Sequence, residues 1–268
     1  MAQLTQDDAV AAAAVRDAER AASAAGVSLR ELTGMGEQAE AIRLLSEIWK
    51  RSPENPPVPP ELLRAMSKAG NYIGGAFIED ELIGVAIAFH ANPERHALHS
   101  HIAGISSAHA GRSVGFALKQ HQRAWALSRG IDTIEWTFDP LVARNAHFNL
   151  SKLGAEPAEY LANFYGEIAD GINSDDETDR LLVSWRLRSE EAIACASGVP
   201  LAVAREPGDI AVAVPADIER VRREDMGAAQ QWRRRVREQL TELLDDGGRI
   251  IGFDRVDGYL VRPGKDSA

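Results

Sequence analysis

The chain has 268 residues, of which 45% are hydrophobic, and a formal net charge of −10 at pH 7. A chain of this length buries a core sufficient for one large domain or two modest ones. The acidic balance argues against broad binding to nucleic acid or anionic membranes, because phosphate groups attract a basic surface. We therefore expect neither a nucleic acid nor a membrane as a partner.

Signals for membrane insertion, disulfides and metal binding are weak. The longest apolar run, Ala9 to Val15, is far shorter than the roughly 20 residues that span a bilayer. Asp7 and Asp8 precede it, where a signal peptide would be basic, so a cytoplasmic location is expected. The single cysteine, Cys195, excludes an intramolecular disulfide and is expected to be a small buried residue. The histidines lack metal-ligand spacing, so no metal is expected.

Helices are expected to dominate the first part of the chain. Alanine-rich segments favour helices, and apolar residues at helical spacing mark a buried face. The predicted elements are a helix over residues 1–25 that ends at Gly26, a short strand Val27–Leu32, and helices Ala39–Trp49 and Glu61–Ala69 on either side of a proline-rich loop.

The middle of the chain changes to a strand pattern. Two apolar runs around Glu79-Asp80-Glu81 predict a hairpin, and a third run continues the meander. The predicted order is strands Tyr72–Ile78, Leu82–Phe89 and Leu98–Ile105, a small-residue loop Ser106–Ser113, a helix ending at Gly130, and a strand Thr133–Phe138. This order is typical of an α+β fold with a mixed sheet flanked by helices.

The last part of the chain alternates helices and strands. It is expected to contain a helix Asn145–Leu153, strands Tyr160–Ile168 and Leu181–Leu187, a strand 210–214, a helix Ala228–Leu244, and strands Arg249–Asp254 and Tyr259–Val261. Two charge clusters stand out, an acidic one (Asp170, Asp175, Asp176, Glu177, Asp179) and a basic one (Arg233, Arg234, Arg235, Arg237). Both are interpreted as solvated faces, with attraction of a cationic amine by the acidic segment as the alternative.

The segment His109–Gly115 carries the most information about function. It lies between a predicted strand and a predicted helix, so its backbone amides stand at a helix N-terminus, where they favour an anion such as pyrophosphate. Small residues let the backbone approach a ligand, and Arg112 can add a cation. Structural punctuation before a helix is the alternative interpretation.

The order of elements around this loop resembles the Gcn5-related N-acetyltransferase (GNAT) superfamily. The resemblance covers roughly Val27 to Leu187 and includes the hairpin, the loop Ala110–Gly115 and the tail of Asn145–Ala155, with its Asn-Ala…Lys-Leu-Gly-Ala pattern. It implies a mostly antiparallel sheet and an acyl-CoA co-substrate, acetyl-CoA or another acyl-CoA. It assigns pantetheine binding to Ala103, Gly104, Ile105 and Asn145, and pyrophosphate binding to Gly111, Arg112, Ser113, Val114 and Gly115.

The whole arrangement is similar to a bacterial branch of this superfamily with a C-terminal extension. The expected divisions are an N-terminal helix (1–26), a GNAT-like acyltransferase domain (27–188), a connector (189–208) and a small C-terminal α/β module (209–268). The pattern leaves open whether this module is a separate domain or extends the first sheet.

The chain also departs from the family pattern. Ala110 stands at the usual Arg/Gln position of the loop, and Ser113 stands at its central glycine. The family's frequent general-acid tyrosine has no counterpart, which leaves Tyr160 and Tyr165 as possible substitutes. These departures favour the rival hypothesis, a non-catalytic GNAT-like binding or scaffold protein.

Acyl transfer to an amine needs a group that takes the ammonium proton. Strand alternation places His99 and His101 on one face, and His101 is the first candidate base. Glu135 is the second, and a half-exposed or salt-bridged structural role is the alternative for both. The expected function is acyl-CoA-dependent N-acyl transfer, with acetyl as the expected group, to a small amine. The protein is expected to be a homodimer that associates through the C-terminal module or the N-terminal helix.

Overall fold

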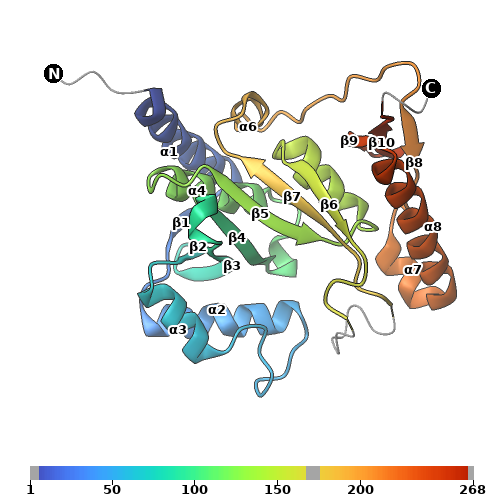
Figure 1. Ribbon diagram of the computed structural model, residues 1–268. Helices are drawn as coiled ribbons and strands as arrows, with labels where there is room; N and C mark the ends of the chain where they lie inside the picture. The colour runs from blue at the N-terminus through green and yellow to red at the C-terminus, as the bar shows by residue number, and fades with distance from the viewer. Residues whose placement is uncertain (1–5, 167–175, 265–268) are drawn as a thin grey trace. The chain divides into compact units, whose positions relative to one another are not determined.

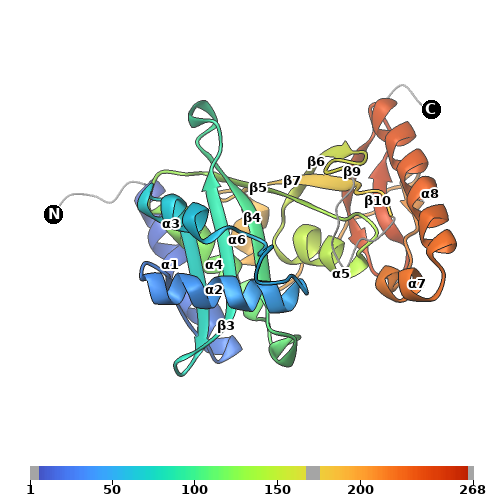
Figure 2. The same cartoon turned by 90° about the horizontal axis from the view of Figure 1, so that it is seen from below.

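A computed structural model describes residues 6–166 and 176–264. The chain divides into two compact units, one up to Glu135 and the other from Trp136 onward. Figures 1 and 2 together label their helices and strands.

The first unit is built on an antiparallel meander. Strands β1 (Ser28–Glu31), β2 (Tyr72–Ile78), β3 (Glu81–His90) and β4 (Ala97–Ile105) are neighbours in that order, each antiparallel to the next. Strand β5 (Thr133–Phe138) pairs with β4 in parallel and passes into the second unit. The predicted hairpin and third strand are confirmed.

Helices cover both faces of this sheet. Figures 1 and 2 show α2 (Met35–Ile48) and α3 (Pro60–Lys68) on one face, and α1 (Gln6–Ala25) and α4 (Val114–Leu127) on the other. The buried face of α1 consists of alanines, which let it pack closely on α4. The short 3-10 turns η1 (Pro93–Arg95) and η2 (Ser107–His109) flank β4.

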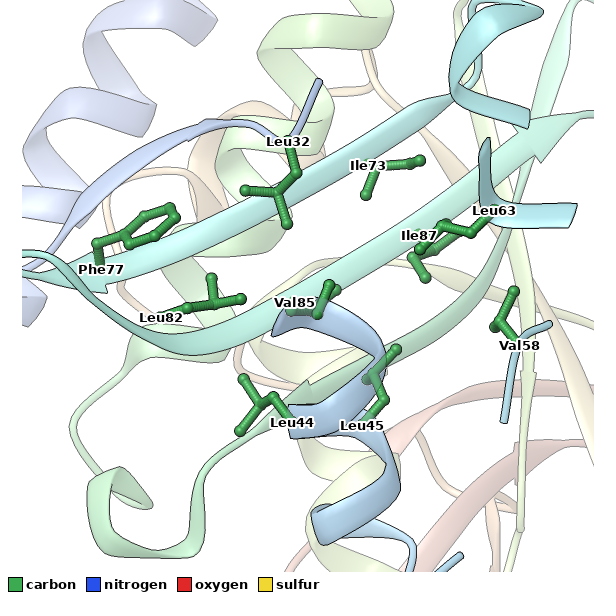
Figure 3. Packing of buried hydrophobic residues seen from close by; sticks show 11 residues of the cluster. Leu32, Leu44, Leu45, Val58, Leu63, Ile73, Phe77, Leu82, Val85 and Ile87 are labelled. Carbon is green, nitrogen blue, oxygen red and sulfur yellow. The ribbon is translucent and has the colours of Figure 1, made fainter. Parts of the chain in front are cut away.

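The core under α2 explains why its sequence forms a helix here. Figure 3 shows Leu44 and Leu45 of α2 turned toward the sheet, where Val85 and Ile87 of β3 face them. Burying one such aliphatic side chain stabilises the fold by about 1.5–3 kcal/mol. The apolar stripe of α2 therefore fixes that helix on the sheet.

The second unit continues from β5 and carries the C-terminal region. It contains strands in the order β5-β7-β6, with β7 (Arg180–Arg186) antiparallel to β6 (Glu156–Leu161). A second sheet has the order β8-β10-β9, formed by β8 (Ile210–Val212), β9 (Arg249–Asp254) and β10 (Gly258–Arg262). Its helices are α5 (Ala143–Ala146), the π-helical turn η3 (His147–Lys152), α6 (Glu190–Cys195), α7 (Ile218–Glu224) and α8 (Met226–Asp245).

Several elements differ from the sequence-based expectation. The strand expected at Tyr160–Ile168 is β6, which ends at Leu161, and residues 167 and 168 lie outside the described part of the chain. Helix α6 lies within the expected connector because Ser189 caps it, accepting a hydrogen bond from the Ala192 amide at 3.1 Å. The fold class, a mixed and mostly antiparallel sheet flanked by helices with a small C-terminal α/β extension, is confirmed.

The interpretation of the charge clusters as solvated faces is wrong for their central members. Asp176 and Arg233 are 8% and 1% exposed, and Asp179 is fully buried. Arg233 donates to both Asp176 and Asp139, and Arg222 of α7 donates to the same two carboxylates. Pairing with hydrogen bonds permits this burial, which charge density along the sequence does not reveal. Asp170 and Asp175 lie outside the described residues.

Candidate functional site

Strands β4 and β5 are paired over only a short stretch. The pairs are Ala97–Thr133, Leu98–Ile134 and His99–Glu135, whereas β4 continues to Ile105. Ser100 is therefore the first residue of β4 beyond this pairing. One edge of β4 stays hydrogen-bonded to β3, and its other edge presents alternate N–H and C=O groups that a peptide-like ligand can pair with.

Two histidines and a phenylalanine gather on one face of the sheet at this position. The ring centroids of Phe89 and His99 are 5.0 Å apart, those of Phe89 and His101 are 5.8 Å apart, and those of the two imidazoles are 6.3 Å apart. Partial burial lowers the pKa of His101, and burial, His101 and Lys119 lower the pKa of His99. Both imidazoles are therefore mainly neutral at pH 7 and can accept a proton.

Glu135 has a charged partner. It is 8% exposed, and Arg95 of η1 donates a hydrogen bond to its carboxylate. Because Glu135 is the register partner of His99, both side chains project from the same face of the sheet. The structure thus brings His101 and Glu135 to one region, and of the two, Glu135 is the one held in a salt bridge.

The loop before α4 has the backbone of an anion-binding turn. Gly111 and Ser113 both adopt positive φ, 81° and 62°. The first hydrogen bond of α4 runs from the Ala117 amide to the Ser113 carbonyl at 3.1 Å, and no side chain caps the helix. The amides of residues 114–116 therefore lack intrahelical acceptors.

The surroundings of this loop leave room for a ligand. A Cβ added at Gly111 or Gly115 would meet no atom within 4 Å. Gly111, Arg112 and Ser113 are exposed, whereas Val114 is buried and anchors the start of the helix. Open space, uncapped amides and a nearby guanidinium fit a pyrophosphate group.

The end of β4 packs closely against Trp49. A Cβ on Gly104 would lie 2.6 Å from the ring of Trp49, so a larger residue here would require that ring to shift. Ala103 is exposed, and Ile105 is half-buried. Their expected role in pantetheine binding depends on backbone groups, and it stays a prediction.

The other sequence-based candidates lie in the second unit. Asn145 is half-buried on α5, where its backbone amide donates to the Val142 carbonyl at 2.9 Å. Tyr160 donates its hydroxyl to Asp179 at 2.6 Å, and burial followed by this carboxylate raises its pKa well above the usual value. Tyr165 is 43% exposed, with its hydroxyl 3.3 Å from Thr137 Oγ1. The proton of Tyr160 is thus held by a carboxylate.

Sequence reasoning missed a buried polar cluster between α4 and β4. Lys119 is 6% exposed and donates to Ser100 Oγ at 2.9 Å and to Gln122 Oε1 at 3.1 Å. Burial lowers the pKa of Lys119 to about 7. A lysine on an amphipathic helix is usually solvated, so only the packing around α4 reveals this group.

A separate apolar groove of about 420 Å³ lies between α2, the proline-rich loop and α3. Its lining includes Met35, Ile42, Pro53 and Arg64, and no residue of β4 or of the loop 111–115. The groove is therefore distinct from the features described above.

Comparison with known proteins identifies the domain. Residues 39–155 match the model of the acetyltransferase (GNAT) family. No curated protein matches the sequence. The N-acetyltransferase of Staphylococcus aureus Mu50 is similar in structure, with a TM-score of 0.50 and 13% identity over 60% of this chain and 99% of that one.

Other similar structures share less of the geometry. The ribosomal-protein-S18-alanine N-acetyltransferase of Escherichia coli has a TM-score of 0.47 and 14% identity, covering 68% of this chain and 97% of its own. An aminoglycoside 6'-N-acetyltransferase complexed with coenzyme A has a TM-score of 0.47 and 16% identity, covering 61% of this chain and 98% of its own.

Residues 39–155 therefore match the GNAT acetyltransferase family, and the chain carries a further C-terminal region beyond this match. Within residues 6–166 and 176–264, no helix is sufficiently long and apolar to cross a membrane.

Proposed function

We propose that this protein is an acyl-CoA-dependent N-acyltransferase that transfers an acetyl group to a small amine. The observation that carries the proposal is the loop Gly111–Gly115, with its positive-φ backbone and the uncapped start of α4. Ser113 has a left-handed conformation at the position where the family pattern has glycine, which supports an anion-binding turn here. The GNAT family match supports the same reaction class.

In this proposal the coenzyme is held by backbone and charge. The amides of residues 114–116 and the Arg112 guanidinium bind the pyrophosphate, and the free edge of β4 at Ala103–Ile105 pairs with the pantetheine amides. The resemblance to the family assigns Asn145 to the pantetheine arm as well. When bound, acyl-CoA supplies the acyl group as a thioester.

His101 is the proposed base. Its imidazole is accessible and mainly neutral at pH 7, because partial burial lowers its pKa, so it can take the proton that an attacking ammonium group must lose. Glu135 is the weaker candidate because it already accepts from Arg95. Neutral His99 and Phe89 beside His101 offer an apolar, aromatic surface to the acceptor.

Thermal unfolding with and without millimolar acetyl-CoA tests coenzyme binding. A ligand at 100 times its dissociation constant stabilises the native state by about 2.7 kcal/mol, so a clear rise in melting temperature is expected. Arg112→Glu should abolish the rise, because it places a carboxylate beside the phosphates. Arg16→Glu, at an exposed position of α1, is the matched control and should retain it.

The rival function, a non-catalytic scaffold, makes the opposite prediction. The departures at Ala110 and Ser113 favour it, and such a protein should show no stabilisation by acetyl, propionyl or longer acyl-CoA. Absence of any shift in the wild-type protein would contradict the transferase proposal.

A further inference from the structure

We infer that Ser100 and Lys119 form the acid that returns a proton to the coenzyme sulfur, on the face of β4 opposite His101. The inference rests on the proposed function, because it assigns a role in acyl transfer. Amine acylation requires a base and also a proton donor for the leaving thiolate. Among the described residues, we find no other proton donor at this position on that face of β4.

The position of Ser100 is the first step. It is the first residue of β4 beyond the last pair with β5, His99–Glu135. If the coenzyme lies along the free edge of β4 with its pyrophosphate at the loop 111–115, its thioester end reaches back toward this point. The side chain of Ser100 points to α4, since it accepts from Lys119, whereas that of His101 contacts Phe89 and His99 on the other face.

The composition of the cluster is the second step. Lys119 Nζ lies 2.9 Å from Ser100 Oγ and 3.1 Å from Gln122 Oε1, and all three side chains are at most 6% exposed. Both of these contacts are to neutral oxygens, one of a hydroxyl and one of an amide. Burial accordingly lowers its pKa to about 7, which lets it give and take a proton near neutral pH.

An unsatisfied donor is the third step. The Gln122 Nε2 group is buried and has no hydrogen-bond partner in the described part of the chain. Leaving such a donor unpaired costs about 1–3 kcal/mol, and a catalytic role is one explanation for such a group. The Gln122 side chain can therefore still donate a hydrogen bond to a further group.

The proton and electron balance is complete without another reactant. His101 takes the proton that the amine nitrogen loses as the C–N bond forms. Ser100 Oγ–H gives its proton to the sulfur, which keeps the electron pair of the broken C–S bond, and Lys119 Nζ–H returns a proton to the Ser100 oxygen. The products are an amide and coenzyme A with a neutral thiol, and exchange with water transfers the surplus proton from His101 back to Lys119.

The charged groups around Lys119 define what a titration reports. On β4, the charge of Lys119 contributes to the lowered pKa of His99. Ser100 and Gln122 are neutral. An ammonium within about 4–6 Å of a thiolate lowers the thiol pKa by roughly 1–3 units.

The thiol pKa of bound coenzyme A tests the inference without requiring an acceptor. It is measured from the ultraviolet absorption of the thiolate, as a difference against desulfo-coenzyme A, after calorimetry has established binding to each variant. Lys119→Met should raise the pKa of the bound thiol by about one unit or more. Lys119→Arg keeps the charge and should leave the thiol pKa low, as should Lys68→Met, at an exposed position of α3.

The outcomes separate the two proposals. An unchanged thiol pKa in Lys119→Met, with coenzyme A bound, would overturn the role of Lys119 and leave the proposed function standing. Failure of coenzyme A to bind the wild-type protein would overturn both. If Lys119→Met does not fold, Ser100→Ala replaces it; loss of the hydroxyl should raise the bound thiol pKa, and no change would overturn the inference.

Discussion

Ser113 holds a backbone conformation that glycine adopts at lower cost. Its φ of 62° lies in the left-handed region, which costs a residue with a side chain about 1–2 kcal/mol. The resemblance to the family placed this residue at a glycine position, and the backbone shows that the serine adopts a conformation typical of glycine. Whether the departure affects coenzyme binding stays a prediction.

Ser113→Gly should stabilise the protein by about 1 kcal/mol because it relieves this strain. Urea unfolding measures the change. Ser106→Gly is the control, since Ser106 has an ordinary φ of −49° and glycine there adds only freedom to the unfolded chain. A loss of stability in Ser113→Gly would show that the hydroxyl makes a contribution greater than the strain.

Lys119 makes stability depend on pH in a defined direction. Its folded pKa of about 7 lies below the ordinary 10.5, so the unfolded state binds more protons between these values and stability rises with pH across that window. Below pH 7 the destabilisation by the buried charge of Lys119 is complete. It is at most about 5 kcal/mol, a figure that leaves out the hydrogen bonds of Lys119.

Lys119→Met should therefore be more stable than the wild type at pH 7, and the difference should shrink as the pH approaches 10.5. Denaturant unfolding at several pH values measures it. Lys68→Met should follow the wild-type pH profile throughout. Parallel profiles for wild type and Lys119→Met would indicate that Lys119 titrates normally in the folded protein.

Among the secondary-structure elements, those with clear periodicity were predicted well. The meander β2–β4 and helices α2, α3 and α8 follow from alternation and helical spacing. Helices α6 and α7 were missed because each is short, and local caps at Ser189 and Asp217 define them. The burial of Lys119, Asp176 and Asp179 was missed, because burial depends on contacts between segments that are distant in the sequence.

Helix α8 contributes Arg233 to a buried ionic cluster in the second unit. The guanidinium is 1% exposed and lies 3.1 Å from Asp139 and 2.8 Å from Asp176. Burial opposes ionisation of Asp139, but Arg233 and Arg222 lower its pKa to about 2. The stabilisation from this carboxylate is therefore present above its ordinary pKa of 3.8 and is lost as the pH falls toward 2.

Arg233→Ala should destabilise the second unit by about 3–5 kcal/mol, because it leaves two buried carboxylates with one guanidinium. Arg234→Ala is the matched control at the neighbouring, exposed position and should change stability by less than about 0.5 kcal/mol. Equal effects of the two substitutions, measured by chemical denaturation, would contradict the assigned role of the cluster.

At the scale of the whole molecule, the sequence predicted the fold class and the family. It left open the acceptor and whether the C-terminal module is a separate domain. The boundary at residue 188 stays a prediction. The acceptor depends on pocket shape, which no residue type specifies by itself. Family resemblance predicted a coenzyme loop because that motif is local in sequence, and its role stays a prediction, whereas the Ser100–Lys119 pair joins positions that are 19 residues apart.

We also predict that the whole molecule forms a homodimer. Exposed apolar side chains remain on both expected interfaces, with Val15 of α1 44% exposed and Val256, between β9 and β10, 90% exposed. Light scattering is expected to give twice the chain mass of 29.1 kDa. A single species at the chain mass would rule out the dimer.

The central claim is that acyl-CoA binds at the start of α4 and along the end of β4. Hydrogen–deuterium exchange with and without acetyl-CoA locates binding directly, because a bound pyrophosphate protects the amides that α4 leaves uncapped. We expect slower exchange in residues 103–116 of the wild-type protein and no such change in Arg112→Glu. Unchanged exchange in this segment, with acetyl-CoA in excess, would contradict the account.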